Sequence, residues 1–494
     1  MPPKIDPEVG CEIPEPGHWP VDPQEDVPIA EERLWIDGCF DFFHHGHAGV
    51  MLQSRRLGTE LVVGLHSDEE IRANKGPTVM TLKERVAAVE ACRFSTKCVP
   101  HAPYVTSLPW ISHYGCKYVT HGDDITSDAG GNDCYRFVKK AGRMIIVSRT
   151  PGISTTDLVG RMLLCTKEHF IRSLTDTLRG REGAGNEYER VQSGQMMADR
   201  ISEYAAAAAG RGDGVQVFSF KAKHQSIERR ASRGHASHAE TGQHHDSGTG
   251  SFVPMVHGIG PKPDQRLVYV DGGFDLFSSG HIAFLRTVTS LEEDLGRQQD
   301  WYSEAARSKR IQEHGEDYPS AFVVAGVHDD EVINYHKGLN YPIMNIFERG
   351  LCVVQCRYIH QVVFGAPYAP TKAYLTSLPA VTDAASASSS QDRLPDAVYH
   401  GPTSYMPSTS SPDPYSDAKA RGIFAETPAH DFQDVNAAQI VRRILDRREE
   451  YEERQRKKGV KGVGEGSLRR QEMEAEAEEA RLRKLREVEA QFGA

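Results

Sequence analysis

The sequence predicts an α/β protein with two tandem, doubly wound parallel sheets joined by a flexible linker. From residue 31 onward, short apolar runs alternate with amphipathic segments and glycine-bearing turns, which is the pattern of strands alternating with helices. The pattern restarts near residue 265, after a stretch rich in Ala, Gly, Ser and His. At 494 residues the chain exceeds one ordinary hydrophobic core, so two domains are expected.

The strands expected in the first copy are short and partly β-branched, and most of them lead into a helical pattern. They lie at residues 34–36, 61–65, 97–100, 118–120 and 144–147. Because parallel strands end at the same edge of a sheet, residues that directly follow these strands are expected to share one crevice.

An internal repeat sets the domain boundaries. Residues 268–281 correspond to residues 34–47, Lys337-Gly338 corresponds to Lys75-Gly76, and His400-Gly401 corresponds to His121-Gly122. We therefore expect a flexible N-terminus at 1–30, a first domain at 31–178, a largely disordered linker at 179–264, a second domain at 265–448 and a charged helical tail at 449–494. Within the linker, residues 215–220 are the one candidate strand.

Composition excludes several classes of function. The net charge is −11 and no basic run dominates, which argues against a nucleic-acid partner. The longest apolar runs are strand-sized and the N-terminus lacks a hydrophobic core, so we expect neither a transmembrane helix nor a secretory signal. The nine cysteines are scattered without a CxxC pair, which fits free thiols in a reducing cytoplasm.

Residues 34–47 read as a strand, a tight turn and the start of a helix. His44 and His47 are three residues apart at that helix start, with Gly46 between them. A helix N-terminus carries partial positive charge and free backbone N–H groups, so two imidazoles there indicate a phosphate site.

A second phosphate-facing helix start follows the strand at 144–147. Ser154, Thr155 and Thr156 form an N-cap cluster, and Arg149 lies just before it as a forked cation. Lys75 and the turn that begins at His121 also follow strands. Lys75 alone can equally be a solvated lysine, and His121 can serve only its turn.

These motifs together, DGxFDxFHxGH after a strand and RTxGISTT, resemble the cytidylyltransferase family within the HxGH nucleotidyltransferases, which have Rossmann-like domains. The two-copy arrangement resembles the ethanolamine-phosphate branch of that family. The resemblance implies transfer of a cytidylyl group from CTP to phosphoethanolamine with release of pyrophosphate, a step toward phosphatidylethanolamine. It also implies Mg²⁺ that arrives with CTP and is bridged by phosphate oxygens, with no side-chain ligands.

The resemblance assigns roles to the residues of the first copy. The catalytic set is His44, His47, Lys75 and Arg149. Both histidines and Arg149 also bind CTP, together with Gly38, Phe40, Gly152, Ile153, Ser154, Thr155 and Thr156. The acceptor set is Asp37, His121, Asp123, Asp124 and Tyr135.

The acceptor set favours ethanolamine over choline. A quaternary ammonium prefers an aromatic cage. Residues 125–128, which follow the His121 turn, include no aromatic residue, and the next aromatic residue along the chain is Tyr135. Two alternatives stay open: a cytidylyltransferase for phosphocholine or another phosphorylated alcohol, and a non-catalytic nucleotide-binding regulator.

The second copy has lost part of this chemistry. Ser278 stands in the place of His44, and residues 432–438 lack the Ser/Thr cluster. We expect the copy to keep the fold and, at most, a second nucleotide pocket formed by Asp271, Gly273, Phe274, His281, Lys337, His400 and Gly401. The expected partners are small-molecule substrates, with the two repeats packed on each other, a homo-oligomer, and peripheral association with the endoplasmic reticulum as further options.

Overall fold

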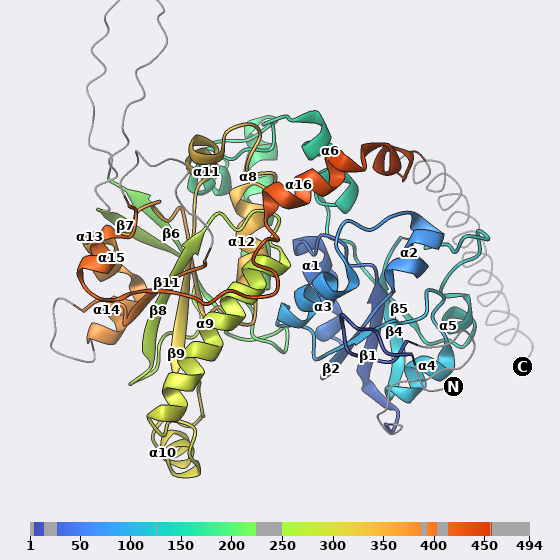
Figure 1. Ribbon diagram of the computed structural model, residues 1–494, viewed down its shortest axis with the longest axis horizontal. Coiled ribbons are helices and arrows are strands. Elements are labelled where there is room, and N and C mark those ends of the chain that lie inside the picture. Colours follow the sequence, from blue (N-terminus) through green and yellow to red (C-terminus); the bar gives the residue numbers. More distant parts are fainter. Residues whose placement is uncertain are drawn as a thin grey trace, which may run out of the picture. The chain divides into compact units, whose positions relative to one another are not determined.

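The computed structural model describes residues 4–13, 27–124, 126–223, 249–386, 393–402, 413–454 and 456. It comprises two compact units (Figure 1). The first contains residues 1–90, 95–159 and 440–494, and the second contains residues 91–94 and 160–439, within the described ranges. Each unit is built around one sheet, as the sequence predicts.

The first unit holds a five-stranded, all-parallel sheet in the order β3-β2-β1-β4-β5. Its elements are β1 (Ala30–Gly38), α1 (His45–Arg55), β2 (Glu60–Leu65), α2 (Asp68–Lys75), α3 (Leu82–Ala91), β3 (Lys97–Pro100), α4 (Leu108–His113), β4 (Cys116–Gly122), α5 (Arg136–Lys140), β5 (Met144–Val147) and the start of α6 (Thr155–Leu164). β1 is central, and its last residue, Gly38, is in register with Leu65 at the end of β2. This register brings the turns after β1 and β2 to the same edge.

The second unit repeats this order and extends it. Its seven strands run β12-β11-β8-β9-β10-β6-β7, so five of them reproduce the first sheet, and β7 pairs with β6 antiparallel. Its elements are α7 (Leu174–Leu178), α8 (Glu187–Tyr204), β6 (Gln216–Ala222), β7 (Gly250–Val256), β8 (Arg266–Gly272), α9 (Ser279–Gln298), α10 (Glu304–His314), β9 (Ala321–Val327), α11 (Asp330–Lys337), α12 (Ile346–Val354), β10 (Gln361–Phe364), α13 (Lys372–Ser377), α14 (Pro379–Ser386), β11 (Ala397–His400), α15 (Ser416–Ala420), β12 (Phe424–Glu426) and the start of α16 (Ala437–Asp446).

The expected linker at 179–264 differs most from the structure. Its described residues contain α8, β6 and β7, and the two strands complete the second sheet. The candidate strand at 215–220 is confirmed as β6. The sequence hides α8 because that helix is polar and buries only Gly194, Ile201 and Tyr204. Residues 224–248, where most of the predicted disorder falls, lie outside the described residues.

The chain ends also depart from expectation where they are described. β1 begins at Ala30, before the predicted strand. In the N-terminal segment expected to be flexible, the Asp6 carboxylate pairs with His101 Nε2 at 2.7 Å. The predicted tail helix is seen at 449–454 and 456, and its remainder lies outside the described residues.

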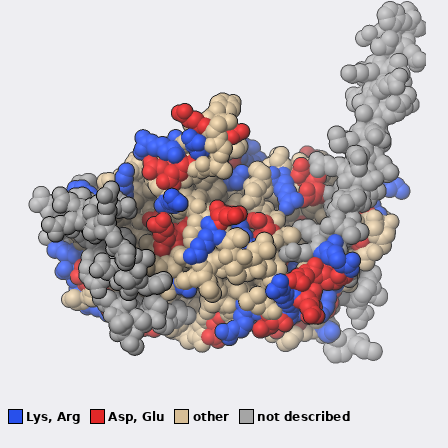
Figure 2. Space-filling model, turned by 90° about the horizontal axis from the view of Figure 1, so that it is seen from above, with Lys and Arg blue, Asp and Glu red and all other residues tan. Residues whose placement is uncertain are grey.

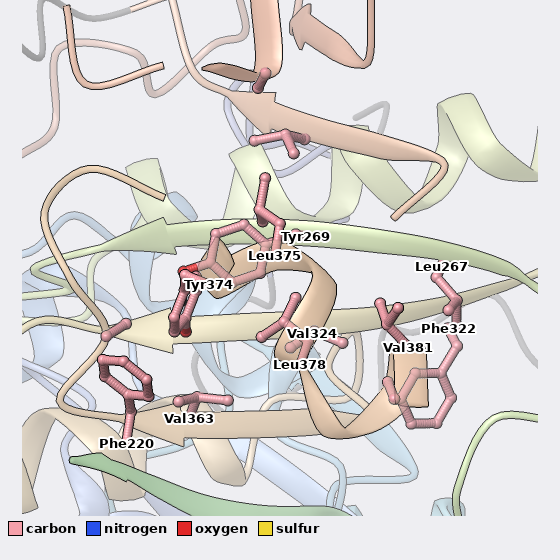
Figure 3. Close-up of a cluster of buried hydrophobic side chains, with 14 of the residues drawn as sticks. Phe220, Leu267, Tyr269, Phe322, Val324, Val363, Tyr374, Leu375, Leu378 and Val381 are labelled. Carbon is pink, nitrogen blue, oxygen red and sulfur yellow. The ribbon is translucent and has the colours of Figure 1, made fainter. Parts of the chain in front are cut away.

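Each sheet buries its own apolar core. In the first unit, Trp35, Trp110 and Val119 are fully buried within one cluster. In the second, Tyr269 and Tyr374 lie among aliphatic side chains of the strands, and Phe220 of β6 meets Tyr374 edge-on (Figure 3). The burial of Phe220 gives the physical reason why β6 belongs to the sheet.

Two surface properties bear on partners. No helix in the described ranges combines the length and apolar character needed to cross a membrane. On the face seen in Figure 2, acidic and basic side chains are interspersed.

Candidate active site

The turn that follows β1 carries backbone strain. Phe40 (φ 52°) and Phe42 (φ 48°) both lie in the left-handed region, which is costly for aromatic residues. Asp41 between them accepts hydrogen bonds from Val79 N (3.1 Å) and Met80 N (2.9 Å), which ties the turn to the loop before α3. The hydrogen bonds of this buried carboxylate therefore stabilise the strained conformation of the turn.

His44 and His47 meet at the start of α1. His44 is the N-cap, and its Nδ1 accepts from Gly46 N at 3.1 Å, while His47 Nδ1 accepts from His44 N at 3.4 Å. The two rings stack with centroids 4.0 Å apart. Because each Nδ1 is an acceptor, each neutral ring carries its proton on Nε2 and can donate from there.

Electrostatics keep both rings neutral. Burial, followed by the charge of neighbouring groups, holds the pKa of His44 well below its ordinary value. Burial and the cations Arg149 and Lys75 lower the pKa of His47 to about 3. The structure thus gathers the four predicted catalytic residues, and it offers an anion two Nε2–H donors beside two cations.

The start of α6 is tied to this turn. Gly152 has φ +87° with open space around it, so only its backbone conformation requires glycine. Ile153 is buried against α1, because a Cβ on Gly46 would lie 2.9 Å from Ile153 Cγ2. Ser154 Oγ accepts from Asp157 N at 3.0 Å, and Thr155 Oγ1 donates to Asp41 O at 3.2 Å. The predicted second helix start is present, with Thr156 in its first turn, and its role in binding phosphate stays a prediction.

Three predicted residues take positions that refine their expected roles. Lys75 is the last residue of α2 rather than a loop residue, and its Nζ lies 5.9 Å from the centre of the Tyr104 ring. Arg149 is exposed and pairs with Asp124, which we assigned to the acceptor. Phe40 is buried edge-on to His47, with ring centroids 5.4 Å apart, and Gly38 packs on it.

The acceptor residues Asp37 and Tyr135 form one buried network. Asp37 Oδ2 accepts from Trp35 Nε1 (2.8 Å) and Thr106 Oγ1 (2.7 Å), and its Oδ1 accepts from the Tyr135 hydroxyl at 2.7 Å. Three donors already satisfy this carboxylate, so its observed role is to hold Tyr135. Burial and the charge of Asp37 raise the pKa of Tyr135 well above its ordinary value, which keeps the hydroxyl protonated as the donor.

Two further histidines differ in tautomer from His44 and His47. His121 Nδ1 lies 2.9 Å from Gly122 O, and His66 Nδ1 lies 3.0 Å from Ala102 O, so both Nδ1 atoms donate and both Nε2 atoms are left as acceptors. Burial is the largest cause that lowers the pKa of each ring. His121 packs on Tyr135 with ring centroids 4.6 Å apart. Asp123 follows in the bend after β4, half-buried.

Sequence reasoning did not single out His66, nor Arg85, which ties two strand ends together. The Arg85 guanidinium is fully buried and donates to Cys39 O (2.8 Å), His66 O (2.8 Å) and Asp68 Oδ1 (2.7 Å). Cys39 follows β1 and His66 follows β2, so Arg85 ties together the ends of these two strands. The internal repeat could have identified both residues, because His328 and Arg349 occupy the corresponding positions in the second copy.

The second copy keeps the frame of this site. Phe274 (φ 49°) and Leu276 (φ 50°) repeat the strained turn, and Asp275 accepts from Ile343 N and Met344 N at 2.8 and 2.9 Å. His281 is half-buried with its Nδ1 accepting from Ser278 N at 3.1 Å, and desolvation and Lys337 lower its pKa to about 3.

The acceptor side of the second copy differs in its hydrogen bonding. Asp271 Oδ1 accepts from the Tyr415 hydroxyl at 2.5 Å, while its buried Oδ2 has no hydrogen-bond partner among the described residues. Burial raises the pKa of Asp271 to about 7. His400 lies against Tyr415, with ring centroids 5.1 Å apart, and its Nδ1 donates to Gly401 O. Gly273 contributes its carbonyl to Arg349.

The helix start on the phosphate side of the second copy is partly occupied by a backbone carbonyl group. The Ser278 hydroxyl donates to Val435 O at 2.9 Å, and a Cβ on Gly280 would lie 2.2 Å from that same oxygen. A carbonyl oxygen therefore stands at the α9 start. In the two sheets, His121 is in register with Ile146 and His400 is in register with Glu426. Arg149 lies three residues after Ile146, and the residue three after Glu426 is Ala429, so Ala429 takes the place of Arg149 in the second copy. The second copy offers an anion fewer donors and one fewer cation.

No group of three or more His, Cys, Asp or Glu side chains in the described ranges is arranged to hold a metal ion. The predicted Mg²⁺ stays a prediction.

The comparisons with known proteins agree with this geometry. The family model described as cytidylyltransferase-like matches residues 35–161. Over 432 residues the chain is 36% identical to ethanolamine-phosphate cytidylyltransferase of Mus musculus, covering 87% of this chain and 89% of that protein. It is 33% identical over 432 residues to the enzyme of that name from Dictyostelium discoideum, covering 87% and 95%.

The similarity to a choline-phosphate enzyme is shorter. Choline-phosphate cytidylyltransferase A of Rattus norvegicus is 39% identical over 133 residues, which are 26% of this chain and 36% of that one. The matches to the ethanolamine-phosphate enzymes are long enough to include both copies. With two repeated units, one complete anion site and relatives that match along most of their length, the chain belongs to the ethanolamine-phosphate cytidylyltransferase family.

Proposed function

We propose that the first copy is the site at which this chain transfers the cytidylyl group of CTP to phosphoethanolamine, giving CDP-ethanolamine and pyrophosphate. The observation that carries the proposal is the pair of neutral histidines at the α1 start, whose Nδ1 atoms are occupied and whose Nε2–H groups remain as donors. Two cations and the α6 start accompany them.

The reaction needs positioning and charge stabilisation more than covalent help. The acceptor phosphate oxygen attacks the α-phosphorus of CTP in line, the bond from that phosphorus to the bridging oxygen breaks, and pyrophosphate leaves. His44 and His47 would donate to the triphosphate, whose charge grows on the leaving oxygens. Arg149 and the α6 start would hold the β- and γ-phosphates. Mg²⁺ would be held by phosphate oxygens and water, and would supply neutralising charge.

Lys75 would neutralise charge where donor and acceptor phosphates meet. Arg149 pairs with Asp124 in the structure. Binding of CTP would therefore exchange this exposed ion pair for contacts with phosphate, at small cost because exposed pairs are worth about 1 kcal/mol or less.

Tautomers supply a reason for an ethanolamine head group. The Nε2 atoms of His66 and His121 are acceptors, and a primary ammonium has N–H donors to satisfy them. A quaternary ammonium has none, so choline would bury these acceptors without partners, at about 1–3 kcal/mol for each group. This supports the preference that the sequence suggested on weaker grounds.

The test is pyrophosphate release by the purified chain with CTP and Mg²⁺, offered phosphoethanolamine or phosphocholine separately. Release with phosphoethanolamine and little with phosphocholine supports the proposal. Equal release with both contradicts the tautomer argument. Absence of release in folded protein that still binds CTP favours the non-catalytic regulator.

The second copy is not proposed to catalyse. Its pocket keeps His281, Lys337 and His400, and it is a candidate for nucleotide binding alone. A cytoplasmic location with peripheral membrane association stays a prediction.

A further inference from the structure

The residues that follow the second copy return to the first unit. α16 leads into a helical segment, and described residues 443–454 of this stretch contact the loop at 76–80, which joins α2 to α3. That loop begins directly after Lys75. We call residues 443–454 the C-terminal clasp.

The clasp binds three successive carbonyl groups of the loop. Arg454 donates to Pro77 O at 2.6 Å, the Tyr451 hydroxyl donates to Thr78 O at 2.9 Å, and Arg443 donates to Val79 O at 3.3 Å. The loop amides at Val79 and Met80 are bonded on their other side to Asp41. The backbone of this loop is therefore fixed by side chains from two distant parts of the chain.

Charge strengthens both ends of the clasp. Arg443 forms a two-pronged ion pair with Glu84, with both N–O distances 2.8 Å and Glu84 buried. Arg454 lies 3.4 Å from Asp41 Oδ2, and its aliphatic stem covers Gly76. One guanidinium thus contacts both the loop after Lys75 and the strained turn before His44.

The second unit supplies an internal comparison. Arg161 pairs with Glu348 at 2.7 and 2.8 Å and donates to Ile343 O at 3.1 Å, and His169 Nε2 bonds Pro342 O at 2.8 Å. These contacts repeat those of Arg443 and Tyr451 at the same spacing of eight residues. Eleven residues after Arg161 stands Arg172, which is exposed, whereas Arg454 at the matching position is half-buried on the turn. The contact of Arg454 distinguishes the complete site from the altered one.

We propose that the C-terminal clasp positions the 76–80 loop, and with it Lys75, for cytidylyl transfer, and that Arg454 is its positioning residue. The inference rests on the proposed function of the first copy. Lys75 is exposed at the end of α2 and directly precedes this loop, so the backbone of the loop helps to set where its ammonium group lies.

The experiment compares R454A with two matched controls, R172A and R456A. R172A removes an arginine from the corresponding place in the second unit. R456A removes an exposed arginine just after the clasp, where Arg456 pairs with Glu453 and the two side chains are 71% and 41% exposed. Steady-state pyrophosphate release gives kcat and both KM values, thermal unfolding gives Tm, and hydrogen exchange reports on the amides of residues 76–80.

R454A is expected to lower kcat about tenfold to a hundredfold, as small displacements of a catalytic group do, with faster exchange of the 76–80 amides. R172A and R456A should stay within twofold of the wild type. R454K keeps the positive charge but lacks the planar guanidinium with its several N–H donors, and it should recover part of the kcat that R454A loses. If R454A does not fold, Y451F tests the same clasp by removing one hydroxyl.

Unchanged kcat and exchange in folded R454A overturn the proposal, as does a loss of kcat that R172A or R456A reproduces. A loss that follows Tm alone, without R454K rescue, also overturns it. Failure of the proposed function looks different, because the wild type would then release no pyrophosphate while the exchange measurement still tests the clasp.

Discussion

The buried arginines Arg85 and Arg349 allow one perturbation to be made twice in the same chain. Arg85 donates to Cys39 O, His66 O and Asp68, and Arg349 donates to the corresponding Gly273 O, His328 O and Asp330, and also to Met344 O. We consider R85M and R349M, which keep an unbranched apolar stem and remove the guanidinium.

Burial of the partner sets the size of each effect. Removing one member of a buried ion pair costs about 3–5 kcal/mol. Asp68 keeps 37% of its side chain exposed and can be hydrated, whereas Asp330 is fully buried. R85M should therefore lie near the lower end and R349M near the upper end. At about 2–4 °C per kcal/mol for units of this size, the Tm losses are about 6–12 °C and about 10–20 °C.

Activity should follow the opposite order. Arg85 fixes the backbone after β1 and β2, where the first site is built, so its loss should lower kcat about a hundredfold. R349M should retain kcat within a few-fold, although it is the less stable variant. Both are assayed by pyrophosphate release below their unfolding transitions, with circular dichroism to confirm folding. If the two variants lose activity in step with their Tm values, the assignment of the chemistry to the first copy is wrong.

Three further predictions follow from single sites. H44A and H47A should each lower kcat about 10²–10³-fold by removing an Nε2–H donor, while H281A keeps appreciable activity; equal losses at all three would contradict the asymmetry. G152A places a side chain at φ +87° in open space, so it should destabilise by about 1 kcal/mol or more through backbone strain alone, measured by urea unfolding. The raised pKa of Asp271 means that this carboxyl binds more protons in the folded state, so Asp271 contributes a component of the unfolding free energy that falls as pH rises from about 4 to about 7. D271N should lack that component of the slope in unfolding titrations, and an identical slope would refute the assignment.

Much of the first site could be predicted because its signals are local. The spacing of His44 and His47 at a helix start and the cluster at Ser154 determine where donors point through hydrogen bonds between near neighbours. Both parallel sheets followed from the alternation of short apolar runs with helical segments. The preference for ethanolamine was also reached, although by the absence of an aromatic residue.

The missed features depend on partners that are distant in sequence. Arg85 acts through carbonyl groups 19 and 46 residues away, and Arg454 lies 413 residues from Asp41. The sequence indicated β6 as a candidate strand, but its place in the second sheet depends on its pairing with β10, so composition alone assigned the surrounding residues to a linker. The repeat offered an indirect signal, since Glu84-Arg85 recurs as Glu348-Arg349 without an obvious local reason.

The strained turn of the second copy shows which part of the site frame is kept in both repeats. Phe274 and Leu276 keep their left-handed backbone although Ser278 stands in this copy where His44 stands in the first. Asp275 ties the turn to the loop before α12, and Arg349 binds Gly273 O, so a change in the turn would break several buried hydrogen bonds at once. The imidazole at the helix start can therefore be replaced without disturbing the turn that presents it. The second copy offers a preformed frame on which protein engineering can build a new ligand site.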